Sequence, residues 1–439
     1  MRVAAVAGGR VVADPDRYAA ILLAGLRPAR STLSVASRRC QDVRMSVMVS
    51  MFDAHRTRTS EKYTAYPPDV LPMFVAEMDS MLAEPVRDAL VTAVTNGDTG
   101  YVGHGRALPE AFVDFAEDRW GWRVDPDLVR TTTDVSVAAV ETLRRVIEPG
   151  DQVVIMPPVY PPFWEYVAEA GGSVTEVPLL APEGDPDPFD TTAGWRMDLD
   201  GITRAFAEGA RTVLLCNPHN PLGLVHDRAS LAALARLAAE WDAVVVSDEI
   251  HAPLVHADAT FTPFLDSCPE AAGLGVALTS ASKAWNLAGT KCALMIGASP
   301  RARAWFDGMP TEVVERTGIL GYTASVAAFS EGGPWLASLL TELAANRRTL
   351  AERLGDVLPG AGYRQPQASY LAWLDLRALP WGEDPARPLI DEAKVALGSG
   401  PDFGRQGLGF ARLNFGCSAE TLDEGLSRLK AAYERRADG

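Results

Sequence analysis

The chain has 439 residues, 47% of them hydrophobic and 22% charged, which is the composition of a globular protein large enough for two domains. Its formal net charge of -16 argues against nucleic acid as a partner, because nucleic-acid-binding proteins normally carry a basic surface. The five cysteines are odd in number and form no CxxC pair. We therefore expect no disulfide framework, no metal site and a cytoplasmic location.

The N-terminal segment does not follow the sequence pattern of the rest of the chain. Tyr18–Leu26 is an apolar run, but it falls short of the ~18 residues that span a bilayer, and it lacks the basic start and small-residue cleavage site of a secretory signal. The arginine- and serine-rich residues 27–44 slightly resemble an organellar transit peptide. Because three methionines stand between residues 45 and 51, we instead expect residues 1–51 to be an extension, either mobile or produced by an upstream start codon.

Through the middle of the chain, apolar runs of strand length alternate with segments of helix length. This pattern is typical of an α/β fold with a largely parallel sheet. The apolar residues within each run are continuous rather than alternating, as expected for strands that are covered on both faces. Between two of the runs, Ser230–Trp241 has apolar residues at helical spacing. The predicted strands are Val153–Met156, Thr212–Cys216, Val244–Ser247, Val276–Thr279 and Ala293–Ile296.

Downstream of these strands the pattern becomes mixed. A long helix is predicted at Pro334–Leu358 and a final helix at Ala419–Ala437, with strands at Tyr370–Leu374 and Phe410–Phe415 between them. We expect this part of the chain to belong to a smaller α+β domain. The segment Glu183–Asp190, rich in proline and aspartate, is expected to be a surface loop.

Three polar residues follow three of the predicted strands, at the edge where open α/β sheets bind ligands. They are Asn220 in NPHNPLG, Asp248 in SDEIH and Lys283 after a Ser-x-Ser. Pyridoxal phosphate needs a lysine amine that bonds its aldehyde and a carboxylate that keeps its ring nitrogen protonated. An amide at the third strand end can donate to the phenolic oxygen of the ring. The three positions together predict a pyridoxal-phosphate site.

Each of these residues has an ordinary alternative role. Taken alone, Lys283 is a surface lysine, and Asp248 is a helix N-cap with Glu249 as a rival carboxylate. We favour Asp248 over Glu249 because it is the first acid after the apolar run. Lysine suits the site because desolvation makes its amine reactive, and a released amine can move the proton on the substrate's α-carbon.

Eight motifs carry a resemblance to a known family. They are LPMFVAEMDS (71–80), TGYVGHG (99–105), PPVYPPF (157–163), NPHNPLG (217–223), SDEIHAPLV (247–255), SASKAWNLAGTK (280–291), ASYLAWLDLR (368–377) and FARLNFGCS (410–418). The chain resembles fold-type-I pyridoxal-phosphate enzymes of the aminotransferase class I/II superfamily, and within it the MalY/PatB-type cystathionine β-lyase (C–S lyase) branch. The similarity starts near Phe52. It implies the PLP-dependent transferase fold, with a large domain at 96–315 and a small domain made of 52–95 and 316–439.

The phosphate of the cofactor is expected at the start of a predicted helix. Val135 and Ser136 open the pattern VSVAAVETLRRVI, and the free N–H groups and the dipole of a helix start favour an anion. Family members usually have glycine where this chain has Asp134, so the Asp134 carboxylate must point away from the phosphate or the backbone must differ. Ser280 and Ser282 would add hydroxyl groups.

The resemblance implies roles for four further residues. Lys291 stands where many relatives carry arginine, and it would act as a point charge on the phosphate. Tyr160 would stack on the ring, with a core tyrosine as the alternative. His251 stands where other members have a tyrosine that donates to the ring oxygen, and a plain polar lining role is equally open. Tyr101 matches a position that reaches the neighbouring subunit's site, which implies a homodimer with shared active sites.

Arg412 is the candidate ligand for the substrate. It shares one face of the predicted strand with Asn414, whereas Leu413 and Phe415 share the other face. An arginine held in this way can bind a carboxylate through two parallel hydrogen bonds, and a structural ion pair is the alternative. The resemblance implies that Arg412 binds the α-carboxylate of a small amino-acid substrate.

The resemblance implies a C–S β-lyase that cleaves cystathionine or another cysteine S-conjugate to a thiol, pyruvate and ammonia. An aminotransferase shares the first steps, and the residues named above do not separate the two activities. Two other possibilities stay open: the same scaffold redirected to another amino-acid transformation in a biosynthetic pathway, and a regulator that contacts a transcription factor, as some relatives of this branch do.

Overall fold

A computed structural model describes residues 46–103, 105–184, 187 and 189–437. The predicted N-terminal extension, with its apolar run, therefore lies outside the described residues except for 46–51, and the predicted loop at Glu183–Asp190 lies partly outside. Residues 46–51 are packed: Met48 and Met51 are buried, and the Val47 N–H donates to a carboxylate oxygen of Glu342 at 2.8 Å. Among the described helices, none is long and apolar enough to cross a membrane.

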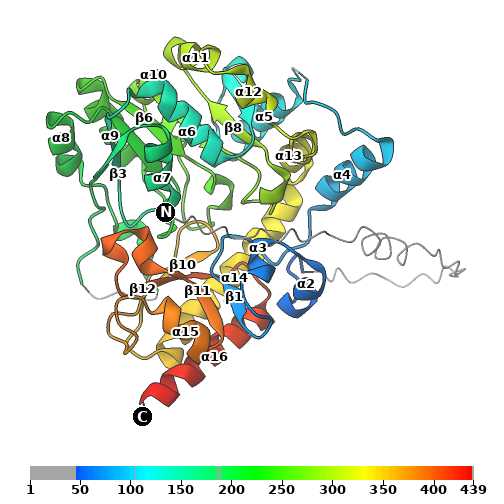
Figure 1. Cartoon of the computed structure of the whole chain (residues 1–439), viewed down its shortest axis with the longest axis vertical. Helices are drawn as coiled ribbons and strands as arrows, with labels where there is room; N and C mark the ends of the chain where they lie inside the picture. Colours follow the sequence, from blue (N-terminus) through cyan, green and yellow to red (C-terminus); the bar gives the residue numbers. More distant parts are fainter. Residues whose placement is uncertain (1–45, 104, 185–186, 188, 438–439) are drawn as a thin grey trace, which may run out of the picture. The chain divides into compact units, whose positions relative to one another are not determined.

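The larger of two β-sheets in the described part of the chain has seven strands and is mostly parallel. Its strands β3, β6 and β8 are labelled in Figure 1. Strands β3 to β7 run parallel, and β8 runs antiparallel to both β7 and β2. The link from β7 to β8 contains no crossover helix of the kind that joins parallel neighbours. The predicted α/β fold with a mostly parallel sheet is confirmed. In spatial order the strands are β2 (Val129–Thr132), β8 (Ala293–Ile296), β7 (Gly275–Thr279), β6 (Val244–Asp248), β5 (Thr212–Cys216), β3 (Gln152–Ile155) and β4 (Ser173–Glu176).

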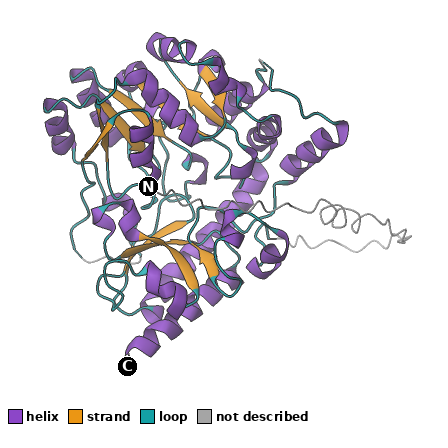
Figure 2. Cartoon of the chain, viewed as in Figure 1, coloured by secondary structure: helices purple, strands orange, loops and turns teal. Residues whose placement is uncertain are grey.

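Both faces of this sheet are covered by helices, as Figure 2 shows. Successive residues of one strand therefore enter different cores: Val244 and Val246 pack in one, and Val245 packs in the other. This explains the continuous apolar runs in the sequence. The first core contains residues of α6 (Val135–Val146), α7 (Pro162–Glu169) and α11 (Pro300–Asp307), and the second contains residues of α8 (Leu199–Ala207), α9 (Arg228–Glu240) and α10 (Pro269–Leu274).

The second sheet has five strands, four of which come from the C-terminal part of the chain. Its first strand, β1 (Leu71–Met73), pairs in parallel with β11 (Val395–Ser399), so a segment near the N-terminus completes the C-terminal sheet. The other pairs are antiparallel: β11 with β12 (Phe410–Asn414), β12 with β10 (Leu371–Asp375), and β10 with β9 (Gly362–Tyr363). Residues 46–439 form one compact unit, so the boundaries of a large and a small domain stay a prediction.

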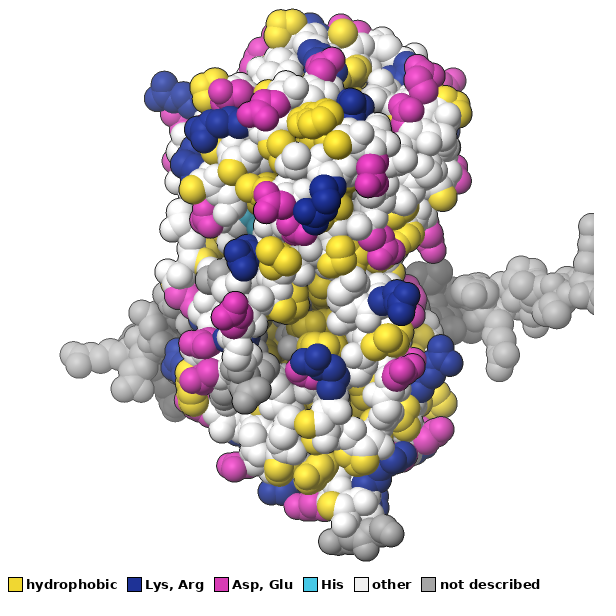
Figure 3. All heavy atoms as spheres, turned by 90° about the vertical axis from the view of Figure 1, so that its left-hand side faces the viewer, with side chains coloured by type: hydrophobic (Ala, Val, Ile, Leu, Met, Phe, Trp, Pro, Cys, Tyr) yellow, Lys and Arg dark blue, Asp and Glu magenta, His cyan; other side chains and the backbone are white. Residues whose placement is uncertain are grey.

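The remaining helices lie before, between and after the strands of the two sheets in the sequence. Helix α13 (Ile319–Glu331) contacts α4 (Glu84–Asn96) and α5 (Ala107–Trp120). The others are α2 (Met51–Thr57), α3 (Glu61–Thr64), α12 (Thr311–Glu315), α14 (Gly333–Val357), α15 (Ala386–Glu392) and α16 (Ala419–Ala437). Short 3-10 helices lie at Pro126–Leu128, Thr192–Gly194, Ala252–Leu254, Phe264–Asp266, Ala288–Thr290, Gly400–Phe403 and Arg405–Gly407. On the face drawn in Figure 3, basic and acidic side chains are interspersed and form no extended basic area.

Candidate active site

A cavity of about 360 Å³ lies at the carboxyl ends of β5, β6 and β7, and we call it the catalytic cavity. Ten of the twelve residues predicted for the site line it. They are Val135, Ser136, Tyr160, Asn220, Asp248, His251, Ser280, Ser282, Lys283 and Lys291. The two exceptions are Arg412, which lines a neighbouring cavity, and Tyr101. The structure therefore brings together polar groups from five segments, which follow β2, β3, β5, β6 and β7.

Lys283 lies in the turn that follows β7, where its side chain is held by backbone. Its Nζ donates to the carbonyl oxygen of Ala76 at 3.0 Å. Burial, together with the nearby Arg412 guanidinium, lowers the pKa of the Lys283 amine to about 8, and Asp248 partly opposes this effect. An amine with such a pKa is partly unprotonated near neutral pH, as a nucleophile or a general base must be.

Asp248 and Glu249 are adjacent, but their carboxylates have different surroundings. Asp248 ends β6, lines the catalytic cavity and is 5% exposed, and it accepts a hydrogen bond from the Ile250 N–H at 3.1 Å. Glu249 is absent from the cavity wall, and its Oε1 accepts from Ser247 Oγ at 3.0 Å and from the Phe264 N–H at 2.8 Å. Burial raises the pKa of Asp248 to about 6. This buried carboxylate, without an ion pair among the described residues, fits a cationic group placed in the cavity.

Arg412 extends from β12 of the second sheet to the edge of the first. Its Nη1 donates to Asn220 Oδ1 at 3.1 Å, and its Nη2 donates to the Phe74 carbonyl at 2.8 Å. The side chain is 6% exposed, its guanidinium lies 4.9 Å from the ring centroid of Phe403, and its Nε has no hydrogen-bond partner among the described residues. Burial lowers the pKa of Arg412 to about 10, so the group stays cationic near neutral pH. Asn414 shares the polar face as predicted, since its Nδ2 donates to the Val75 carbonyl at 2.7 Å.

The start of α6 forms one end of the catalytic cavity. Asp134 is the N-cap of this helix, and its Oδ1 accepts from the Val137 N–H at 2.9 Å. Its Oδ2 forms an ion pair with Lys291 Nζ at 2.9 Å. The Asp134 carboxylate is therefore engaged with the helix and with a lysine, although Asp134 also lines the catalytic cavity. Lys291 itself has a positive φ of 61°.

The serine hydroxyls at this end differ in their bonding. Ser136 Oγ lies 2.6 Å from the hydroxyl of Tyr166, which lines the same cavity. Ser280 Oγ donates to the Cys292 carbonyl at 2.6 Å and accepts from the Ser282 N–H at 3.0 Å. Ser280 thus supports the turn, whereas Ser136 and Ser282 keep hydroxyl groups at the cavity wall.

Tyr160 and His251 add ring systems to the wall. Tyr160 is half-buried, and its ring packs edge-on against Phe163 with centroids 6.3 Å apart. His251 is buried, its ring lies 6.3 Å from that of Tyr370, and its Nδ1 has no partner among the described residues. Burial lowers the pKa of His251 to about 3, so its imidazole is neutral near neutral pH.

The sequence interpretation assigned no role to the segment Phe74–Glu77, which follows β1 and closes the cavity through its carbonyls. The Ala76 carbonyl accepts from Lys283 and also from the buried Tyr370 hydroxyl at 2.9 Å. The Glu77 carbonyl accepts from Asn414 at 2.7 Å. The motif that contains this segment carried the family resemblance, but a backbone acceptor leaves no signature in residue types. Tyr166 was also missed, although it follows the PPVYPPF motif closely.

Tyr101 lies between α4 and α5 and is 95% exposed. It does not line the catalytic cavity of its own chain. The exposed side chain is thus available to another molecule, and the predicted role in a neighbouring subunit stays a prediction.

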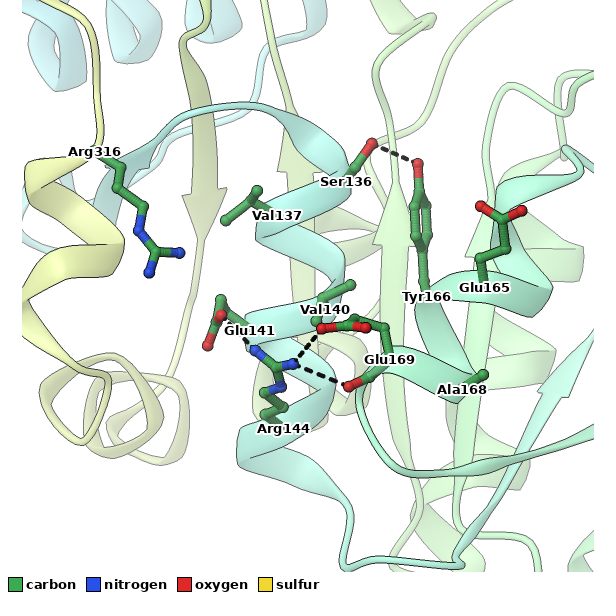
Figure 4. Close-up of a pocket in the computed structure, with 10 residues that line it drawn as sticks. All are labelled: Ser136, Val137, Val140, Glu141, Arg144, Glu165, Tyr166, Ala168, Glu169 and Arg316. Carbon is green, nitrogen blue, oxygen red and sulfur yellow. Dashed lines mark hydrogen bonds and ion pairs between the residues drawn. The ribbon is translucent and has the colours of Figure 1, made fainter. Parts of the chain in front are cut away.

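A larger hollow of about 640 Å³ lies beside the catalytic cavity, bordered by α6 and α7 (Figure 4). Ser136 and Tyr166 line both spaces. In the larger hollow Arg144 is bonded to Glu141 and Glu169, each at 2.8 Å. Its lining includes no lysine, so the amine chemistry belongs to the smaller cavity.

Comparisons with known proteins agree with this geometry. A family model described as aminotransferase class I and II matches residues 85–429. A putative cystathionine β-lyase of Mycobacterium leprae is 44% identical over 398 residues, which are 85% of this chain and 95% of the relative. The cystathionine β-lyase PatB of Bacillus subtilis is 34% identical over 83% of this chain and 92% of its own. The crystal structure of a putative PLP-dependent β-cystathionase from Corynebacterium diphtheriae superposes with a TM-score of 0.82 at 32% identity, covering 89% of this chain and 99% of that one.

Proposed function

The chain belongs to the aminotransferase class I and II family, and from that premise we propose that it is a C–S β-lyase that cleaves cystathionine or another cysteine S-conjugate to a thiol, pyruvate and ammonia. Its cofactor is pyridoxal 5'-phosphate. When bound, this group supplies an aromatic ring that withdraws electrons from the substrate's α-carbon. The single observation that carries the proposal is that Lys283 and Asp248, both with shifted pKa values, line one cavity.

The residues around the catalytic cavity fit this cofactor. Lys283 would bond its aldehyde, and Asp248 would face its ring nitrogen, where a cation compensates the burial of the carboxylate. Asn220 would donate its amide N–H to the ring oxygen, because its Oδ1 already accepts from Arg412. Tyr160 would stack on the ring.

The phosphate would bind at the start of α6. Its donors would be the N–H groups of Val135 and Ser136 in the first turn of the helix and the hydroxyl of Ser282, three residues that line the cavity. Lys291 supplies the positive charge, and the Asp134 carboxylate that pairs with it lowers the net charge of the phosphate site. Ser280 stabilises the turn through its hydrogen bond to the Cys292 carbonyl, and His251 adds a neutral polar side chain to the lining.

The chain's own groups would then act in sequence on the substrate. Arg412 holds the α-carboxylate, which fixes the orientation of the α-carbon. The Lys283 amine, freed by the substrate amine and kept near the Ala76 carbonyl, removes the proton from the α-carbon. The electron pair of that bond forms the double bond to the β-carbon as the β-carbon–sulfur bond breaks. Water converts the resulting enamine to pyruvate and ammonia, and the thiolate takes up a proton.

A homodimer with shared active sites completes the proposal. It is supported by the exposure of Tyr101 and of Val91 and Val94 on nearby α4. The four cysteines among the described residues are free, which supports a reducing cytoplasm as the compartment.

The test separates the lyase from the aminotransferase. The purified protein is incubated with cystathionine and, separately, with pairs of amino donors and keto acids. Pyruvate and a free thiol in equal amounts are expected from cystathionine. Exchange of amino groups without thiol release would contradict the lyase and identify an aminotransferase, and the absence of both reactions would contradict either activity.

A further inference from the structure

A second cavity, of about 370 Å³, adjoins the catalytic cavity, and we call it the outer cavity. Glu61, Val75 and Tyr160 line both spaces, so the two meet at these side chains. Arg412 lines the outer cavity while its Nη1 bonds Asn220 on the wall of the catalytic cavity. The guanidinium thus marks the boundary between them.

The position of Arg412 determines which part of a bound substrate lies next to the outer cavity. Its Nη1 and Nη2 are bonded to Asn220 and to the Phe74 carbonyl, whereas its buried Nε has no partner among the described residues. A substrate whose α-carboxylate binds Arg412 and whose α-carbon lies near Lys283 occupies the junction of the two cavities. Its side chain then has the outer cavity as the adjoining space.

The walls of the outer cavity are largely apolar. Tyr66 and Phe74 pack edge to face with their centroids 5.1 Å apart, and Phe403 lies under the Arg412 guanidinium. Leu397, in β11, lines the same cavity. Such walls suit the methylene groups and the sulfur atom of a thioether, which gain free energy when they leave water.

Two acids, Glu61 and Asp402, and two arginines, Arg387 and Arg412, line the outer cavity. Glu61 and Asp402 line it, and neither forms an ion pair within the described part of the chain. The one other cation, Arg387, is bonded to Asp384 at 2.7 Å. Once a substrate α-carboxylate occupies Arg412, and with Asp384 already on Arg387, the carboxylates of Glu61 and Asp402 are left without a cation. A ligand group with a positive charge is then favoured there over a second carboxylate.

We propose that the outer cavity is the subsite for the leaving thiol, and that Glu61 and Asp402 select cysteine S-conjugates whose thiol portion carries an ammonium group. This inference rests on the proposed lyase function. A thiol with both an ammonium and a carboxylate group meets the requirement through its ammonium, with Arg387 near its carboxylate.

Three cysteine S-conjugates of similar length test the proposal: S-aminoethyl-, S-propyl- and S-carboxymethyl-cysteine. The holoenzyme is assayed for pyruvate release. The expected order of kcat/KM is aminoethyl, propyl, carboxymethyl, with about a tenfold or larger difference between the first and the last. The double variant Glu61→Gln/Asp402→Asn is expected to reduce that ratio to about threefold or less. The control Glu240→Gln, at the end of α9, keeps the wild-type ratio.

The outcomes distinguish the subsite from the reaction. Pyruvate release from all three conjugates without the expected order would overturn the subsite and leave the lyase standing. The same holds if the double variant keeps the wild-type ratio. Release of pyruvate from none of the three would overturn the lyase and the subsite together.

Discussion

The catalytic cavity has two walls of different origin. One wall consists of side chains at the ends of three strands of the seven-stranded sheet: Asn220, Asp248 and Lys283. The other wall consists of backbone carbonyls in the segment Phe74–Glu77, which follow a strand of the second sheet. In the proposed function, the first wall would supply the amine that bonds the cofactor, the carboxylate that faces its ring nitrogen and the amide that donates to its ring oxygen. The second wall supplies fixed acceptors that hold those groups in position.

This difference assigns distinct tasks to the two sheets. Arg412 and Asn414 from β12 donate to the carbonyls of the segment, and so does Lys283 from the other wall. The segment is therefore tied both to the strand that would bind the substrate carboxylate and to the amine that would act on the α-carbon. In the proposed function the geometry of the reaction would therefore depend on the second wall, although its acceptors are all backbone atoms.

The largest loss of activity is expected when the negative charge of Asp248, in the first wall, is removed. Asp248→Asn should lower kcat/KM roughly two-hundred- to several-thousand-fold, as when one partner of a buried charge pair worth about 3–5 kcal/mol is lost. The matched control is Glu249→Gln, one residue away but facing the core, which should retain most of the activity. Equal losses in the two variants would show that the strand, not the cavity-facing carboxylate, matters.

Removal of the cation beside the second wall should have a somewhat smaller effect. Arg412→Ala is expected to lower kcat/KM roughly thirty- to a thousand-fold, because a charge-assisted contact worth about 2–4 kcal/mol is lost. The visible absorbance of the bound cofactor should persist. Arg348→Ala, on the exposed side of α14, serves as the control. Near-normal kcat/KM in Arg412→Ala would refute substrate binding, and loss of the cofactor together with a lower melting temperature would favour a structural role through its bonds to Asn220 and the Phe74 carbonyl.

The two carboxylates of β6 also predict a pH effect on stability. Burial raises the pKa of Glu249 to about 8. The folded protein therefore keeps this proton up to about pH 8, whereas the unfolded chain releases it above about pH 4.5, so the fold loses stability as the pH rises between these values. Glutamine imitates the protonated acid. Glu249→Gln should melt close to the wild type at about pH 5 and at a higher temperature at about pH 9. A difference that does not grow with pH would contradict the buried, protonated state.

The smallest effect on activity is expected when residues at the N-terminus are deleted. Deletion of residues 1–44 should leave cofactor binding and turnover unchanged, because the contacts of Val47 with Glu342 and the burial of Met48 and Met51 all lie beyond the cut. Deletion of residues 1–51 is the matched comparison, and it should lower the melting temperature because it removes two buried methionines. A loss of cofactor already in the shorter deletion would show that residues 1–44 belong to the folded enzyme.

The sequence could predict the first wall because its signals are local. A strand that is buried on both faces is a continuous apolar run, so β5 and β8 were predicted with their true bounds. Strand β2, with the sequence VRTT, and the exposed edge strand β4 have weak apolar patterns and were missed.

The second wall could not be predicted from local patterns. Strand β1 has only three residues, and its partner β11 lies more than three hundred residues away, at Leu71↔Val395. The bond from Lys283 to the Ala76 carbonyl joins residues 207 apart and uses an acceptor that every residue has. The family resemblance identified the motif around Ala76, but only the fold shows what its backbone does.

The account depends most directly on Lys283. The holoenzyme is reduced with borohydride, digested and analysed by mass spectrometry to find the residue that carries the cofactor. The account predicts a single modified peptide with the cofactor on Lys283, and no such adduct and no visible absorbance band in Lys283→Ala, whereas the control Lys430→Ala on α16 behaves as the wild type. A stable adduct on another lysine, such as Lys291, or a reducible bond that survives in Lys283→Ala, would contradict it.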